Sequence, residues 1–131
     1  MEDAKKGFNK HAGTFITLAT GEKYTREFRK HEKDKGKKDF TIAAFFGSAK
    51  LEHLLSNPEA VGLRIYYGLD VDGDGKKDKK FVIVAVDENG RDLIDTEKHL
   101  SKGEKDGDDI LDGGVYCPVN CGPTPSPLNP Q

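Results

Sequence analysis

The first apolar pattern along the chain has the spacing of a helix. Tyr24 and Phe28 are four residues apart and share one helical face, whereas charged residues occupy the opposite face. Thr20 is a suitable N-cap for this segment, and Gly36, with a lysine on either side, is a typical stop. The pattern therefore predicts a helix over residues 21–34.

A second helix is predicted to begin at Ser48, which is a suitable N-cap. It ends at Asn57, because the residue before a proline avoids the α region. Its apolar face consists of Leu51, Leu54 and Leu55. The preceding apolar run, Phe40 to Phe46, is rich in residues that favour β-structure and predicts a short buried strand.

Two further strands are predicted in the second half of the chain. Apolar residues alternate with others from Val61 to Gly68, and Phe81 to Val86 is apolar throughout, which indicates a central strand. Asp70 to Lys80 joins them as an extended hairpin, and Asp87-Glu88-Asn89-Gly90 is a further turn. This order predicts an α+β fold, with two helices packed on one face of a small, mostly antiparallel sheet built around 61–68 and 79–87.

The chain changes character after Gly113. The C-terminal segment holds five of the six prolines and both cysteines, Cys117 and Cys121, so it cannot form a helix or an inner strand. It is predicted to be an extended, polyproline-like arm. We therefore divide the chain into a single α+β domain, residues 1–114, and a Cys/Pro-rich arm, residues 115–131.

Composition excludes several classes of function. A net charge of −2 over 131 residues provides no strong field for nucleic acid, and no apolar run is long enough to span a membrane. Residues 1–10 lack the hydrophobic stretch of a signal peptide, so the protein is expected to be cytoplasmic by default, or extracellular if the chain is a mature form.

The two cysteines are too few for a disulfide scaffold. Their spacing leaves three readings open: a local disulfide in an oxidising compartment, a turn with two buried thiols, or a zinc site completed by His53 and His99.

The sharpest chemical signal is a run of aspartates between the two predicted strands. Carboxylates stand at positions one, three, five and nine of a loop, namely Asp70, Asp72, Asp74 and Asp78. Calcium takes about 6–8 oxygen ligands from a tightly wrapped chain, and the glycine at position six, Gly75, permits the sharp turn. The backbone carbonyl of Lys76 can add a ligand, and Asp78 can act through water. The spacing predicts a weak calcium site.

The alternative for this loop is a metal-free polar hairpin, because aspartate and glycine are ordinary turn residues. Four neighbouring carboxylates repel one another without a cation, which favours metal binding. The loop departs from the EF-hand pattern: position twelve is Phe81 instead of glutamate, and no helices are predicted beside it. It more closely resembles the strand-flanked calcium loops of extracellular β-propeller and thrombospondin-type proteins.

A second acidic region suggests a different function. Its carboxylates are Asp106, Asp108, Asp109 and Asp112, and their density is the one motive for a small metal-assisted hydrolase. The sequence contains no nucleophile elbow, phosphate loop or zinc-protease helix, so a protein without enzymatic activity is predicted. The basic residues 26–39 and the acidic residues 87–112 are either solvated faces or surfaces for head-to-tail attraction between copies.

Three segments resemble a family of short uncharacterised bacterial proteins: Phe45-Phe46-Gly47, Gly62-Leu63-Arg64-Ile65-Tyr66-Tyr67-Gly68, and the Cys117–Cys121 tail that ends in Asn129-Pro130. The resemblance covers most of the chain. It implies a helix-rich N-terminal half, two strands and a Cys/Pro-rich arm, and it implies no particular activity.

Together these observations predict a non-enzymatic, calcium-stabilised binding or structural module. Its partner would be another protein or copies of itself, joined through the C-terminal arm. A groove on its own domain is the other candidate to hold the arm, whose few apolar groups do little to offset the entropy of ordering it. The alternative functions are a small metal-assisted hydrolase and a cytoplasmic accessory protein that binds an unknown protein partner.

Overall fold

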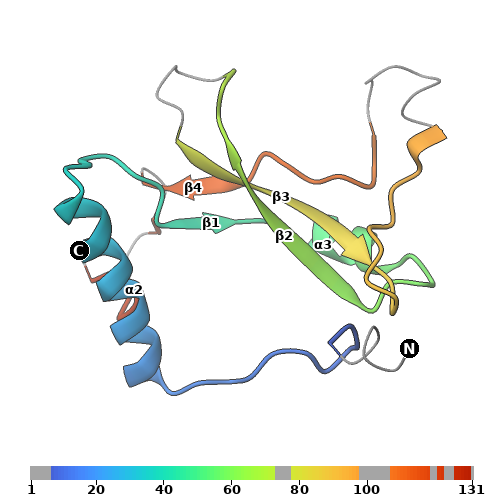
Figure 1. The fold of residues 1–131 in the computed structure, drawn as a ribbon, viewed down its shortest axis with the longest axis horizontal. Coiled ribbons are helices and arrows are strands. Elements are labelled where there is room, and N and C mark those ends of the chain that lie inside the picture. Colours follow the sequence, from blue (N-terminus) through green and yellow to red (C-terminus); the bar gives the residue numbers. More distant parts are fainter. Residues whose placement is uncertain (1–6, 73–77, 98–106, 119–120, 123–125, 131) are drawn as a thin grey trace. The chain divides into compact units, whose positions relative to one another are not determined.

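The computed structural model describes residues 7–72, 78–97, 107–118, 121–122 and 126–130. Figure 1 shows its elements in chain order: α2 (Leu18–Asp34), β1 (Ala43–Phe45), α3 (Ser48–Leu55), β2 (Gly62–Leu69), β3 (Lys79–Val86) and β4 (Val115–Cys117). The chain forms two compact units. The first comprises Met1–Ala12, Phe46–Gly68 and Lys80–Gly114, and the second comprises Gly13–Phe45, Leu69–Lys79 and Val115–Gln131.

The predicted α+β class is confirmed, with two helices and antiparallel strands. The strands form two separate two-stranded sheets, β2–β3 and β1–β4. Nearly all of the β2–β3 sheet belongs to the first unit with α3, whereas the β1–β4 sheet belongs to the second unit with α2. The boundary at residue 114 between a domain and an arm stays a prediction, and the second unit contains residues from both sides of it.

Helix α2 begins three residues earlier than its sequence pattern indicates. The hydroxyl of Thr17 accepts a hydrogen bond from the backbone N–H of Thr20 at 3.1 Å, so Thr17 is the N-cap and the prediction of Thr20 is wrong. The C-terminal boundary is as predicted, because the helix ends at Asp34 and Gly36 adopts a positive φ of 85°. The Phe28 ring packs edge-on against Phe40, with ring centroids 6.1 Å apart.

The strand predicted at residues 40–46 is shorter and more exposed than expected. Only Ala43–Phe45 forms β1, and the Phe45 side chain is exposed. β1 pairs antiparallel with β4, with Ala43 opposite Cys117 and Phe45 opposite Val115. Ala43 and Phe45, which share one face of β1, are both exposed, so the prediction of a buried strand is wrong.

The core of the first unit lies between α3 and the β2–β3 sheet. Leu54, Ile83 and Ala85 form the buried cluster, and partly buried residues that include Leu51 and Leu63 pack against it. Leu55, predicted on the same face, is 46% exposed. The reason is helical geometry, since Leu51 and Leu54 are three residues apart and share a face that Leu55 only borders.

Strand β3 is the central strand of this unit, as its continuous apolar pattern indicates. β2 lies along one side of it, and Leu111 exchanges two backbone hydrogen bonds of 2.9 Å with Ile83 on the other. The backbone N–H of Leu93 also donates to the carbonyl of Ala85 at 2.9 Å. Residues Ile83 to Val86 are buried as a result.

Candidate functional site

The predicted calcium loop connects β2 to β3, and its two ends are joined by the backbone. The N–H of Asp70 donates a hydrogen bond to the carbonyl of Asp78 at 2.9 Å. This contact closes the hairpin immediately before and after the aspartate run. Asp70 and Asp78 are half-buried, whereas Asp72 is exposed.

The described residues contain three of the five predicted ligands, Asp70, Asp72 and Asp78. The other two, Asp74 and Lys76, lie outside the described residues, as does Gly75. Within the described part of the chain, no three His, Cys, Asp or Glu side chains are close enough to hold a metal ion. The donor chemistry fits calcium, because carboxylate oxygens are the ligands it prefers.

The flanking elements explain why the loop departs from the EF-hand pattern. The loop lies between two strands, as predicted, and not between two helices. Phe81, at position twelve, is a strand residue whose ring centroid lies 5.6 Å from that of Tyr67. A glutamate at position twelve would lie within strand β3 and not in a helix that follows the loop. A calcium ion bound here would therefore be held as it is in strand-flanked loops.

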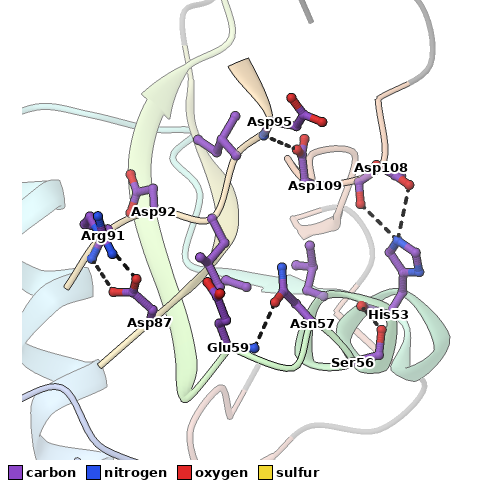
Figure 2. A pocket seen from close by; sticks show the side chains of 14 residues that line it. His53, Ser56, Asn57, Glu59, Asp87, Arg91, Asp92, Asp95, Asp108 and Asp109 are labelled. Carbon is purple, nitrogen blue, oxygen red and sulfur yellow. Dashed lines mark hydrogen bonds and ion pairs between the residues drawn. The ribbon is translucent and has the colours of Figure 1, made fainter. Parts of the chain in front are cut away.

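The second acidic region contributes to a cavity of about 650 Å³ in the first unit. Figure 2 shows this cavity between the end of α3, the residues that follow β3, and the segment with Asp108 and Asp109. Most of the polar side chains in its lining are acidic, and His53 and Arg91 are among the others. Of the four predicted carboxylates, Asp108 and Asp109 line the cavity, and Asp106 lies outside the described residues.

The polar groups of this cavity are engaged with one another. The His53 Nε2 atom lies 3.0 Å from the backbone carbonyl oxygen of Asp108 and 3.8 Å from its carboxylate. The carboxylate of Asp109 accepts a hydrogen bond from the backbone N–H of Asp95 at 2.8 Å (Figure 2). Through these contacts Asp108 is held against α3, and Asp109 is held against the residues that follow β3. Both contacts stabilise the fold.

Asp87 is the buried carboxylate at the wall of the cavity. The backbone N–H groups of Arg91 and Asn89 each donate to its Oδ1 atom at 2.9 Å, and the Arg91 guanidinium lies 3.3 Å from Oδ2. The hydrogen bond from the Arg91 N–H holds the pKa of Asp87 below its usual value, with the Asn89 N–H and the Arg91 charge acting in the same direction and burial opposing them. The predicted turn at 87–90 is confirmed, and this carboxylate is its organising group.

Asp112, the fourth predicted carboxylate, forms an ion pair elsewhere. Its Oδ2 atom lies 3.0 Å from the Lys80 ammonium. Burial raises the pKa of Asp112, but the Lys80 hydrogen bond and charge and the Gly113 N–H together lower it below its usual value. The sequence cluster of aspartates therefore does not form one catalytic group among the described residues.

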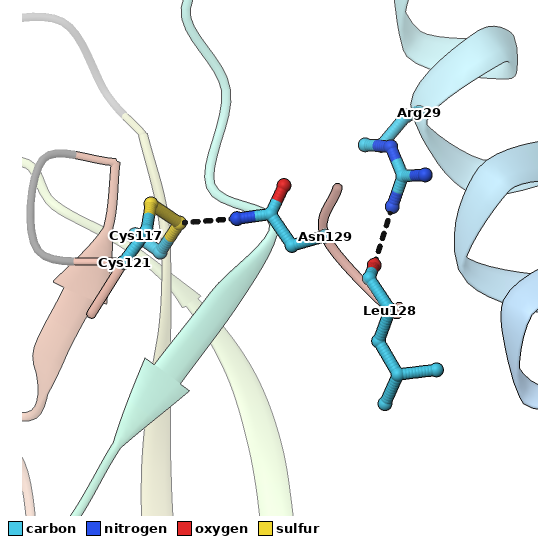
Figure 3. The surroundings of a disulfide bond; sticks show 5 residues. All are labelled: Arg29, Cys117, Cys121, Leu128 and Asn129. Carbon is cyan, nitrogen blue, oxygen red and sulfur yellow. Dashed lines mark hydrogen bonds between the residues drawn. A yellow bond between two sulfur atoms is a disulfide. The ribbon is translucent and has the colours of Figure 1, made fainter. Parts of the chain in front are cut away.

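The two cysteines form a disulfide bond, Cys117–Cys121. The reading with two buried thiols is wrong, and neither sulfur is available to a zinc ion. Figure 3 shows the side-chain amide of Asn129 donating to the Cys117 sulfur at 3.5 Å, and Arg29 of α2 donating to the Leu128 carbonyl at 2.7 Å. The described end of the chain is thus held within its own unit.

Sequence reasoning missed the group that organises one face of β2. The guanidinium of Arg64 donates to the Asp92 carboxylate at 2.6 Å, and the Tyr66 hydroxyl donates to the same carboxylate at 2.5 Å. Asp92 carried no sequence signal, because it approaches them from the other side of β3.

A second missed group is Glu32 of α2, which is 2% exposed. Its carboxylate lies 3.2 Å from the Lys37 ammonium and 3.9 Å from the Lys35 ammonium. Burial raises the pKa of Glu32, but the Lys37 hydrogen bond and the charges of Lys79, Lys37 and Lys35 outweigh it and lower the pKa. The charged segment 26–39, for which a solvated face was one of the two expectations, therefore contains one buried carboxylate, that of Glu32.

No helix within the described ranges is both long enough and apolar enough to cross a membrane. No protein-family model, curated protein or solved structure matches this chain. The resemblance to a bacterial family stays a prediction, and function has to be argued from the chain's own residues.

Proposed function

We propose that this protein is a non-enzymatic binding or structural module that calcium stabilises at the loop Asp70 to Asp78. The observation that carries the proposal is the backbone hydrogen bond between Asp70 and Asp78, which closes the loop at its two ends. Such closure brings hard oxygen donors into one short segment between two strands.

In this proposal the side chains of four aspartates and one backbone carbonyl hold the ion. The ligands are Asp70, Asp72, Asp74, Asp78 and the carbonyl of Lys76. Bound calcium would supply positive charge that offsets the mutual repulsion of these carboxylates. Since the folded hairpin binds the ion and the unfolded chain does not, binding would stabilise the native state.

The partner of the module is proposed to be a protein, either a different one or a second copy. Large exposed apolar side chains support this, among them Phe15, Phe45 and Tyr67. Assembly through the C-terminal arm has less support, because Leu128 and Asn129 contact α2 and the disulfide of their own unit.

The disulfide also bears on the compartment. Disulfides persist in oxidising environments, and weak calcium sites fill where the ion is abundant. Both features favour the extracellular alternative over the cytoplasmic default and over a cytoplasmic accessory protein.

The metal-assisted hydrolase is the second candidate, and the cavity near Asp108 and Asp109 is the observation in its favour. It has less support because Asp109 accepts a backbone hydrogen bond and Asp112 is paired with Lys80. A catalytic acid or base needs to reach a substrate proton, whereas these groups hold the fold together.

Calcium titration calorimetry and thermal melts in calcium or chelator test the proposal. At a calcium concentration about 100 times the dissociation constant, the free energy of unfolding should rise by about 2.7 kcal/mol. The double variant Asp72→Asn, Asp78→Asn should lose both the heat and the shift, whereas the exposed control Asp39→Asn should keep them. Absence of heat and of any shift at millimolar calcium in the unmodified protein would remove the proposal.

A further inference from the structure

The two cysteines of the disulfide lie in different surroundings. Cys117, the last residue of β4, is 3% exposed, whereas Cys121 is an exposed residue. Thiol–disulfide exchange begins when a thiolate reaches one of the two sulfur atoms, so access decides which sulfur is attacked. An external thiolate therefore reaches Cys121 more readily, and Cys117 is then the leaving group.

The backbone of Cys117 is held by contacts that do not involve the disulfide. Its carbonyl accepts a hydrogen bond from the N–H of Ile42 at 2.9 Å, and its Cα atom lies opposite that of Ala43 in β1. Because these contacts do not depend on the S–S bond, Cys117 stays in place when that bond is broken. A cysteine fixed in this way can attack a mixed disulfide on Cys121 and form the original bond again.

A hydrogen-bond donor lies at the sulfur that would leave. The side-chain amide of Asn129 donates to the Cys117 sulfur at 3.5 Å (Figure 3). When the S–S bond breaks, its electron pair remains on this buried sulfur, where a negative charge is costly unless a donor stabilises it. The backbone of Asn129 exchanges hydrogen bonds of 3.2 and 2.8 Å with Ser126, so the donor is positioned before any reaction begins.

The disulfide closes a short loop, because its two cysteines are four positions apart in the sequence. The stabilisation that a disulfide provides by chain entropy grows with the number of residues it encloses, so the gain from this bond is at the small end. The same short spacing keeps the two sulfur atoms close together after reduction, which favours closure of the loop. Such a bond is better suited to reversible exchange than to bracing the fold.

We propose that the Cys117–Cys121 disulfide is a site of reversible thiol–disulfide exchange, at which a low-molecular-weight thiol becomes attached to Cys121. The small thiolate attacks the Cys121 sulfur and forms a new S–S bond there. The electron pair of the broken bond passes to the Cys117 sulfur, which accepts the hydrogen bond from Asn129. The product is a mixed disulfide on Cys121 beside a reduced Cys117.

The mixed disulfide has two outcomes. Cys117 attacks the Cys121 sulfur, expels the small thiolate and restores the original bond. Otherwise a second small thiolate attacks the small-molecule sulfur, and the Cys121 thiolate leaves and takes a proton from water. In that case two small thiols are oxidised to their disulfide while the protein disulfide is reduced. The site requires neither calcium nor the aspartate loop, so it goes beyond the function proposed above.

Exchange of the full chain with reduced and oxidised glutathione, in the presence of chelator, tests the site of attachment. After free thiols are alkylated, tandem mass spectrometry should locate glutathione on Cys121 and not on Cys117. Cys117→Ser lacks the cysteine that would expel glutathione, so its adduct on Cys121 should accumulate to about ten times the level in the unmodified protein.

Cys121→Ser is the matched control, because its remaining cysteine is the buried one. It should react with oxidised glutathione about tenfold more slowly than Cys117→Ser does. Circular dichroism checks that both variants keep their fold, and the mapping on the unmodified protein stands without them. Glutathione on Cys117, glutathione equally on both cysteines, or reaction only after the chain is unfolded would overturn the proposal.

The role of Asn129 is tested by the rate at which excess glutathione reduces the disulfide of the folded protein. Asn129→Ala should slow this reaction about tenfold, because the leaving sulfur loses a hydrogen bond to its charge. If Asn129 only held the tail, the same variant would expose Cys117 and speed the reaction. Ser126→Ala removes the hydroxyl that accepts from the Leu128 N–H at 3.0 Å and is the control, with an unchanged rate expected. An unchanged or faster rate in Asn129→Ala would remove Asn129 from the proposal.

Discussion

The carboxylate of Glu32 lies 3.2 Å from the ammonium of Lys37, and the Glu32 side chain is 2% exposed. A buried carboxylate is stable only when it is paired, because loss of its water shell is expensive. Here the partners come from the residues that follow α2 and, through longer-range charge, from Lys79 at the start of β3. One acid therefore connects three segments of the second unit.

This pairing predicts how stability depends on pH. The folded-state pKa of Glu32 is lowered, so its stabilisation is complete above the unfolded value of 4.5 and is lost as the pH falls below it through the folded value. Glu32→Gln should lower the melting temperature at pH 7, and the difference from the unmodified protein should shrink at pH 3. Glu27→Gln, on an exposed part of the same helix, is the control. A constant difference at both pH values would contradict this role.

The core of the first unit predicts opposite outcomes for two adjacent leucines. Leu54→Ala should reduce the free energy of unfolding by about 2–5 kcal/mol, because it leaves a cavity against Ile83 and Ala85. Leu55→Ala should change it by less than about 0.5 kcal/mol, since that side chain is 46% exposed. Urea denaturation of both variants measures the difference. Equal effects would show that α3 does not use the Leu54 face for packing.

The Asp92 group predicts a smaller effect of removing one hydroxyl. Tyr66→Phe should lower the free energy of unfolding by about 0.5–1.5 kcal/mol, because the hydroxyl donates to the Asp92 carboxylate at 2.5 Å. Tyr24→Phe, on the exposed part of α2, should have little effect and serves as the control. If denaturation gives the same value for both, the hydrogen bond contributes nothing to stability.

The disulfide predicts that the described tail is held more loosely after reduction. The side-chain amide of Asn129 donates to the Cys117 sulfur, and Ser126 and Asn129 exchange backbone hydrogen bonds of 3.2 and 2.8 Å. Reduction should speed hydrogen exchange at the Ser126 and Asn129 amides and remove about 2 kcal/mol of stability, the chain-entropy effect of so short a loop.

The double variant Cys117→Ser, Cys121→Ser is the control for this prediction. It should behave like the reduced protein and should not respond to reductant. Unchanged exchange at Ser126 and Asn129 after reduction would mean that Arg29 and the β1–β4 pairing hold the tail without the disulfide.

Local patterns in the sequence were sufficient for most elements. The spacing of Tyr24 and Phe28, the stop at Gly36 and the turn at Gly90 act over a few residues, so they can be read without knowing the fold. The same holds for the two strands on either side of the aspartate run, because the composition of each strand segment favours β-structure over a helix. The candidate calcium ligands were also found this way, because their signal is spacing within one loop.

Only the tertiary structure decided which distant segments meet. Pairing of β1 with β4 and the meeting of Arg64 and Tyr66 at Asp92 join residues far apart in the chain. Glu32 pairs with the nearby Lys37, but the charge of the distant Lys79 also acts on it. Periodicity reports which face of an element is apolar, but it does not report what covers that face. From the sequence alone, a charged residue is expected to lie at the solvated surface. The burial of Glu32 and the contacts of Asp92 with Arg64 and Tyr66 depend on packing, which the sequence pattern does not report.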